Sequence, residues 1–170
     1  GAEVLKHQTH IPDEEMSLEA LKVIPGNSKH SIYKIIKKCS LSEIDESKLM
    51  KYIISKKKIF ISTPFSKAAV DRLVRFKVPA FKIGSGEWNN LELIEYICKF
   101  KKPIIMSTGM SRLNELIKTV NLINKKKIPL VLMHCTNVYP TPIEKSRLNS
   151  ITIMQKHFKN NIIGYSDHTV

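Results

Sequence analysis

Cysteines are scarce in this sequence, and the few present do not form a metal or disulfide framework. Cys39, Cys98 and Cys135 are odd in number and far apart, and no two of them have the spacing of a metal-binding motif. A small, odd number of widely spaced cysteines is typical of proteins whose thiols stay reduced. We therefore expect a cytoplasmic protein.

Long apolar runs are also missing. No stretch reaches the roughly 18 residues that a membrane span requires, and no signal-peptide pattern opens the chain. Low-complexity segments and interdomain linkers are absent as well. With 170 residues, 42% of them hydrophobic and 25% charged, the sequence predicts one globular domain with a sizeable core and no membrane partner.

Acidic residues are few relative to basic ones, which gives a formal net charge of +13. Aromatic residues are scarce among the lysine clusters, so the stacking surface of a single-strand binder is missing. Three clusters precede strand-like runs, which places them at helix C-termini, where cations complement the helix dipole. We expect no nucleic-acid partner. The clusters occupy residues 37–38, 56–58, 101–102 and 125–127.

Short apolar runs alternate with longer amphipathic ones along the chain. This alternation predicts βαβ repeats and a parallel sheet, and so an α/β fold. In the longer first interval we expect helices near residues 31–38 and 47–56, with Ser47 as an N-cap. The expected strands are residues 4–8, 59–63, 80–84, 104–108, 130–136 and 162–165, and the expected later helices are residues 67–76, 91–100, 113–125 and 148–158.

The stretch FKIGSGE places one lysine inside an apolar strand and follows it with a turn of small residues. Burial of Lys82 as a bare cation would be costly, so it requires a partner, most simply an anion. The turn adds the Ser85 hydroxyl and the Glu87 carboxylate, and its glycines allow close backbone approach to a ligand. The alternative is a lysine that extends from a strand end into solvent beside an ordinary turn.

All the predicted strands finish in polar residues. Ligands of parallel α/β proteins bind at the carboxyl ends of the strands. Two lysines, Lys6 and Lys82, with several neutral donors would form a cradle for an anion with many oxygens, such as a phosphate near a carboxylate. The neutral donors are Thr63, Ser85, Ser107, Asn137 and Ser166.

The histidines have different expected roles. His168 could ligate a divalent ion, but it would need other ligands, and a solvent-facing loop histidine is the alternative. We expect His134 to be a hydrogen-bonded core residue. His7 is opposite in parity to Lys6 and Gln8, and should face the outer layer.

Several motifs, in order and at these distances, closely resemble the bacterial sialic acid synthases, meaning N-acetylneuraminate synthase and its nonulosonic acid relatives. The likeness runs from Gly1 to Val170. It implies a (β/α)8 TIM barrel, a C-terminal antifreeze-like domain, a homodimer when full length, and a divalent metal, Mn²⁺ or Mg²⁺. The implied reaction condenses phosphoenolpyruvate with N-acetylmannosamine and water, giving N-acetylneuraminate and phosphate. The motifs are KHQTH, VIPGN followed by SIYKI, IFISTPFS, FKIGSGE, PIIMSTGM, LMHCTNVYPTP and GYSDHT.

The resemblance also implies roles for single residues. Lys6, Lys82 and Glu87 are the expected catalytic residues, and His168 matches a metal ligand. The positions that match phosphoenolpyruvate-binding residues are Lys6, Thr63, Lys82, Ser85, Ser107, Asn137 and Ser166. The positions that match residues around the acceptor sugar are Gln8, Asn27, Glu87 and Tyr139.

The chain departs from the family pattern at both ends. It begins where the family finishes its first helix and stops after the seventh strand, so we expect the central part of an incomplete barrel, about strands 2 to 7, inactive alone. The first and last strands and the C-terminal domain would be absent. Trp88 stands where close relatives often have a smaller residue, and is expected to narrow the acceptor side of the pocket.

Two alternative functions remain: a legionaminic or pseudaminic acid synthase that uses a diacetamido hexose, and a non-catalytic phosphate-binding fragment.

Overall fold

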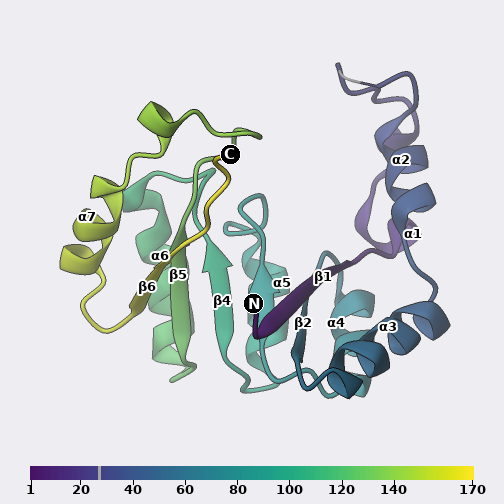
Figure 1. Ribbon diagram of the computed structural model, residues 1–170, viewed down its shortest axis with the longest axis horizontal. Helices are drawn as coiled ribbons and strands as arrows, with labels where there is room; N and C mark the ends of the chain where they lie inside the picture. Colours follow the sequence, from purple (N-terminus) through teal and green to yellow (C-terminus); the bar gives the residue numbers. More distant parts are fainter. Residues whose placement is uncertain (27) are drawn as a thin grey trace. The chain divides into compact units, whose positions relative to one another are not determined.

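The computed structural model describes residues 1–26 and 28–170. The chain forms two compact units, Gly1–Pro79 and Ala80–Val170, each built from strands and helices (Figure 1). Asn27, one of the residues expected near the acceptor sugar, lies outside the described residues. In the described part, no helix is both long enough and apolar enough to cross a membrane.

In the first unit, β1 (Val4–Thr9) pairs in parallel with β2 (Ile59–Pro64). Gln8 lies opposite Thr63 in the register, so both side chains point to the same face of the pair. The sequence predicted the three longer helices but not the two short ones before them. The helices are α1 (Pro12–Glu15), the 3₁₀ helix η1 (Leu18–Leu21), α2 (Ile32–Cys39), α3 (Glu43–Ser55) and α4 (Lys67–Arg75).

Helix α3 begins earlier than the sequence indicated, and the prediction of Ser47 as its N-cap is wrong. The cap is Ser42, whose hydroxyl oxygen accepts a hydrogen bond from the backbone N–H of Asp45 at 3.1 Å. Acidic residues in the first turn also favour this start, because their charge complements the positive end of the helix dipole. Ser47 lies inside the helix.

A buried polar cluster joins the strands of the first unit to its helices. Glu46 is only 1% exposed; it accepts hydrogen bonds from the Thr9 hydroxyl and, at 3.1 Å, from Arg72 Nη1. The Thr9 and Ser62 hydroxyl oxygens are 2.7 Å apart, and His7 Nε2 lies 3.9 Å from Glu46. His7 therefore faces the helix layer, as predicted from its parity.

Loss of the Glu46 carboxylate should destabilise the protein strongly. Glu46→Ala would leave the Arg72 guanidinium, itself 11% exposed, without its buried counter-ion, which typically costs about 3–5 kcal/mol. The matched control is Lys48→Ala on the same helix, since Lys48 is 72% exposed and pairs with Asp45 at the surface, where a pair contributes about 0–1 kcal/mol. Urea unfolding measures both. Equal losses in the two variants would contradict a structural role for the cluster.

In the second unit, four parallel strands pair in chain order and alternate with helices. In the view of Figure 1, α5 and α6 lie behind β4 and β5, on one face of the sheet. The predicted βαβ alternation is confirmed. The strands are β3 (Phe81–Ile83), β4 (Ile104–Ser107), β5 (Leu130–His134) and β6 (Ile162–Tyr165), and the helices are α5 (Leu91–Cys98), α6 (Leu113–Lys125), the 3₁₀ helix η2 (Ile143–Lys145) and α7 (Asn149–His157).

The core of the second unit lies between this sheet and its helices. Phe81, Met106 and Leu132 alternate along their strands with half-exposed residues and are fully buried, as is Ile97 of α5. Lys82 has the opposite parity to Phe81, so it points to the other face of the sheet. The helix-covered face forms the core, and the opposite face carries Lys82 and Ser107 among apolar residues such as Ile105.

Candidate functional site

The Lys82 ammonium is held at the carboxyl end of the neighbouring strand. Lys82 pairs in register with Ile105, and its Nζ donates to Ser107 Oγ, two residues further along β4, at 2.6 Å. A second hydrogen bond goes to the carbonyl of Ile83 at 2.7 Å. The side chain is half-buried. Lys82 and Ser107 thus meet at the strand ends, as the sequence led us to expect, and the ammonium does not simply extend into solvent.

Four residues from three strand ends form a second contact group, which we call the Cys135 cluster: Ser85, Gly109, Cys135 and Asn137. Ser85 Oγ accepts a hydrogen bond from the Gly109 N–H at 3.2 Å and lies 3.2 Å from Cys135 Sγ. The Cys135 thiol donates to Asn137 Oδ1 at 3.7 Å. The structure therefore brings together Ser85 and Asn137, which were expected to bind the same donor. Gly109 and Cys135 were not singled out from the sequence.

His168 lies among other residues predicted for the site. Its Nδ1 is 2.8 Å from the Thr136 carbonyl and its Nε2 is 3.2 Å from Ser166 Oγ. The Tyr139 ring packs on the imidazole with centroids 4.3 Å apart. Since a carbonyl can only accept, Nδ1 carries a proton, so in the neutral imidazole Nε2 is the nitrogen with the lone pair, as in metal-ligating histidines.

His168 fits a metal as one ligand and no more. In residues 1–26 and 28–170, no group of three or more His, Cys, Asp or Glu side chains could hold an ion. Asp167, its neighbour, already accepts hydrogen bonds from Tyr165 and Thr169. An ion bound at Nε2 of His168 would need further ligands that are not among the His, Cys, Asp and Glu side chains of the described residues.

The turn that carries Glu87 is anchored on both sides. Glu87 Oε2 accepts from Asn90 Nδ2 at 2.9 Å, and Asn90 Oδ1 caps α5 by accepting from the Leu93 N–H. The Trp88 indole N–H donates to the Met110 carbonyl at 3.2 Å. Trp88 therefore fixes the turn to the loop after β4, while its expected effect on the acceptor side stays a prediction.

The first unit carries Lys6, Gln8 and Thr63 on one face of its strand pair. Gln8 and Thr63 are register partners, and Lys6 lies two residues before Gln8. Thr63 is buried, whereas Lys6 and Gln8 retain solvent contact. Protein packed around the Lys6 ammonium lowers the pKa of Lys6, because desolvation disfavours the charged form. The expected meeting of Lys6 with Lys82 in a common pocket stays a prediction.

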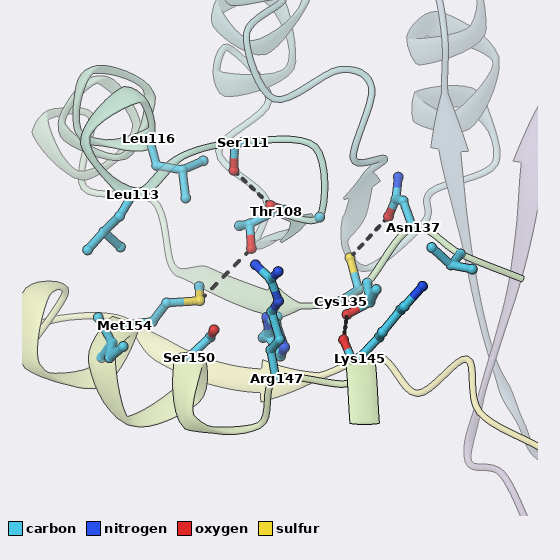
Figure 2. A pocket seen from close by; sticks show the side chains of 15 residues that line it. Thr108, Ser111, Leu113, Leu116, Cys135, Asn137, Lys145, Arg147, Ser150 and Met154 are labelled. Carbon is cyan, nitrogen blue, oxygen red and sulfur yellow. Dashed lines mark hydrogen bonds between the residues drawn. The ribbon is translucent and has the colours of Figure 1, made fainter. Parts of the chain in front are cut away.

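A cavity of about 520 Å³ opens between α6 and α7, next to the Cys135 cluster (Figure 2). Its walls include Cys135 and Asn137 together with two cations, Lys145 and Arg147. Figure 2 shows the Arg147 side chain projecting toward Thr108. Neither Lys82 nor Ser107 lines it. The cavity therefore shares three residues of the Cys135 cluster, Gly109, Cys135 and Asn137, but not the Lys82–Ser107 pair. His134 also lines the cavity and is 8% exposed. Its Nε2 is 2.8 Å from the Ser146 carbonyl, which confirms the prediction of a hydrogen-bonded core residue.

Parallel βα repeats with lysine, hydroxyl, amide and imidazole groups at the strand ends define an α/β protein of the TIM-barrel type, with its candidate site at the end where such barrels bind ligands. The chain matches the NeuB family over residues 1–170 and belongs to it.

Individual relatives agree with this assignment. The chain is 34% identical to pseudaminic acid synthase of Campylobacter jejuni over 99% of its own length and 50% of that protein. It is 41% identical to N,N'-diacetyllegionaminic acid synthase of the same species over 65% of its length and 34% of that protein. Relatives that align with nearly the whole of this chain are about twice as long, so the chain spans about half of their length.

A solved structure supports the fold. The sialic acid synthetase of Leptospira borgpetersenii superposes with a TM-score of 0.84 at 24% identity, over 99% of this chain and 55% of that one. The predicted α/β fold of the TIM-barrel type is confirmed.

Proposed function

We propose that the complete protein is a phosphoenolpyruvate-dependent nonulosonic acid synthase. The observation that carries this proposal is the pairing of Lys82 with Ser107 beside the Cys135 cluster, at the strand ends of a NeuB-family chain. One cation with a ring of neutral donors suits a small ligand that bears both a phosphate and a carboxylate.

The chain's own residues would do two things in this reaction. Lys82, Ser107 and Ser85 would hold the donor so that its methylene carbon faces the aldehyde of the open-chain sugar. That carbon bonds to the aldehyde carbon as the aldehyde oxygen becomes a hydroxyl by taking up a proton; positive charge develops at the neighbouring enol carbon, and water adds there with loss of a proton. Phosphate then leaves with cleavage of its carbon–oxygen bond, and the same donors stabilise the departing anion.

Glu87 and His168 have separate proposed roles. Glu87 would contact hydroxyls of the acceptor sugar or, as the alternative, move a proton. A divalent ion, Mn²⁺ or Mg²⁺, would supply Lewis-acid polarisation of the sugar aldehyde when bound, and His168 would be one of its ligands. The homodimer and the cytoplasmic location that the resemblance implies belong to the same proposal.

The acceptor defines the particular synthase. The first candidate is N-acetylmannosamine, which would give N-acetylneuraminate. The alternative is a 2,4-diacetamido hexose, which would give legionaminic or pseudaminic acid, and the named Campylobacter relatives favour it.

A panel of acceptor sugars, assayed for phosphate release on the complete protein, tests the proposal. We expect release only when phosphoenolpyruvate, one of these sugars and a divalent metal are all present. Chelation should abolish it, and added Mn²⁺ or Mg²⁺ should restore it. Binding of phosphoenolpyruvate with no turnover on any of the sugars would instead support the non-catalytic phosphate-binding alternative.

A further inference from the structure

We propose that Cys135 is a positioning residue that orients two anion donors, Asn137 and Ser85, toward phosphoenolpyruvate. This inference rests on the proposed function, because it names the group that sets the geometry of the same site. Cys135 is only 5% exposed and lies directly after β5, between the strand and Asn137. Its thiol is the contact that Asn137 and Ser85 share.

The thiol fixes which end of the Asn137 amide faces the ligand. A thiol carries one proton, and here it donates that proton to Asn137 Oδ1 at 3.7 Å. The amide oxygen is thereby turned toward the sulfur, and the NH₂ group, which has two donors, is turned away from it. An anion requires donors, so this amide orientation is the useful one for phosphoenolpyruvate. The opposite rotamer would present an oxygen to the ligand and repel it.

The sulfur also holds the Ser85 hydroxyl. Ser85 Oγ already accepts from the Gly109 N–H at 3.2 Å, so its own proton is available to be donated. With the thiol proton directed to Asn137, the sulfur at 3.2 Å is an acceptor for the Ser85 O–H. A thioether or thiol sulfur is a weak acceptor. The Ser85 O–H can therefore turn to an arriving phosphate or carboxylate at little cost.

Gly109 provides the space that this arrangement needs. A Cβ on Gly109 would lie 2.3 Å from Asn137 Oδ1 and 2.8 Å from Cys135 Sγ. Three strand ends thus converge on the sulfur so closely that one extra carbon cannot be accommodated. The alternative is a packing role, in which Cys135 only fills volume, as buried free cysteines often do.

Two substitutions separate positioning from packing. Cys135→Ala removes the donor and the acceptor, and should raise KM for phosphoenolpyruvate about 5- to 30-fold, as expected for loss of about 1–2 kcal/mol of oriented hydrogen bonding, with KM for the sugar unchanged. Cys135→Ser keeps both functions and should stay within about threefold of wild type. The matched control is Cys98→Ala, which removes another buried sulfur, 1% exposed, and should leave both KM values unchanged.

A second readout does not depend on turnover. In protein labelled with ¹⁵N-asparagine, the Asn137 side-chain amide is identified by its loss in Asn137→Asp. Its order parameter should be equally high in wild type and in Cys135→Ser, and should fall into the flexible range, below about 0.6, in Cys135→Ala. An unchanged order parameter in Cys135→Ala, or equal KM losses in the Ala and Ser variants, would overturn the inference. Absence of turnover in wild type would instead refute the proposed function, and the order parameter would still decide the role of Cys135.

Discussion

Lys82→Met is expected to lower kcat/KM for phosphoenolpyruvate by about 10²–10³-fold, the loss typical when one preorganised donor to a developing anion is removed. Methionine keeps the unbranched stem of lysine and removes only the ammonium. Ser107 would lose the donor that now lies 2.6 Å from its hydroxyl. Steady-state kinetics with each substrate varied in turn would measure the effect, and the loss should appear in phosphoenolpyruvate far more than in the sugar.

The control for Lys82→Met is Lys125→Met, the same substitution in the last turn of α6 on an exposed residue. It should leave both substrates unaffected. Lys6→Met is expected to behave like Lys82→Met if the two lysines meet one donor molecule. Equal losses for phosphoenolpyruvate and sugar in Lys82→Met would indicate general misfolding and would contradict a specific role.

Gly109→Ala is expected to lower kcat/KM for phosphoenolpyruvate by about 10²-fold, the loss typical of an anion donor removed or misplaced. The new Cβ would lie 2.3 Å from Asn137 Oδ1 and 2.8 Å from the Cys135 carbonyl oxygen. The carbonyl belongs to the backbone and cannot swing away, so the β4 and β5 ends must separate. Overpacking of this kind also costs about 1–3 kcal/mol of stability. Kinetics and thermal unfolding together would measure both effects.

Gly86→Ala is the folding control for Gly109→Ala. Nothing lies within 4 Å of a Cβ built on Gly86, so the melting temperature should hardly change. If Gly109→Ala kept the wild-type KM for phosphoenolpyruvate, Asn137 would not need its observed position, and the proposed cradle would lose one of its donors.

Secondary structure was largely predictable because the spacing of apolar residues typical of helices, and that typical of strands, are both clear in this sequence. Helix α6 was predicted to the residue, and β6 likewise. Strand β5 was predicted to run to residue 136 but ends at His134. Beyond that point the Thr136 backbone carbonyl accepts from the His168 ring, and the Thr136 side chain donates to the Lys145 carbonyl, so Thr136 is bonded to loop residues. Such long-range partners are not visible in local sequence.

The candidate site was predictable in its residue types but not in its contacts. Lys82 stood out because a lysine between two buried apolar residues needs a partner, and Ser107 is found within hydrogen-bond distance. Cys135 and Gly109 were missed because their roles depend on how three strand ends converge. Cysteine spacing in a sequence indicates only disulfide pairing or metal binding, and a single hydrogen-bonding thiol shows neither.

The central claim is that the strand ends of this chain grip phosphoenolpyruvate. A crystal structure of the complete protein with phosphoenolpyruvate bound would test it most directly. We predict donor oxygens within hydrogen-bond distance of Lys82 Nζ, Ser85 Oγ and Asn137 Nδ2, with the Ser85 hydroxyl turned from the Cys135 sulfur toward the ligand. Phosphoenolpyruvate bound away from Lys82, for example in the cavity between α6 and α7, would contradict the account.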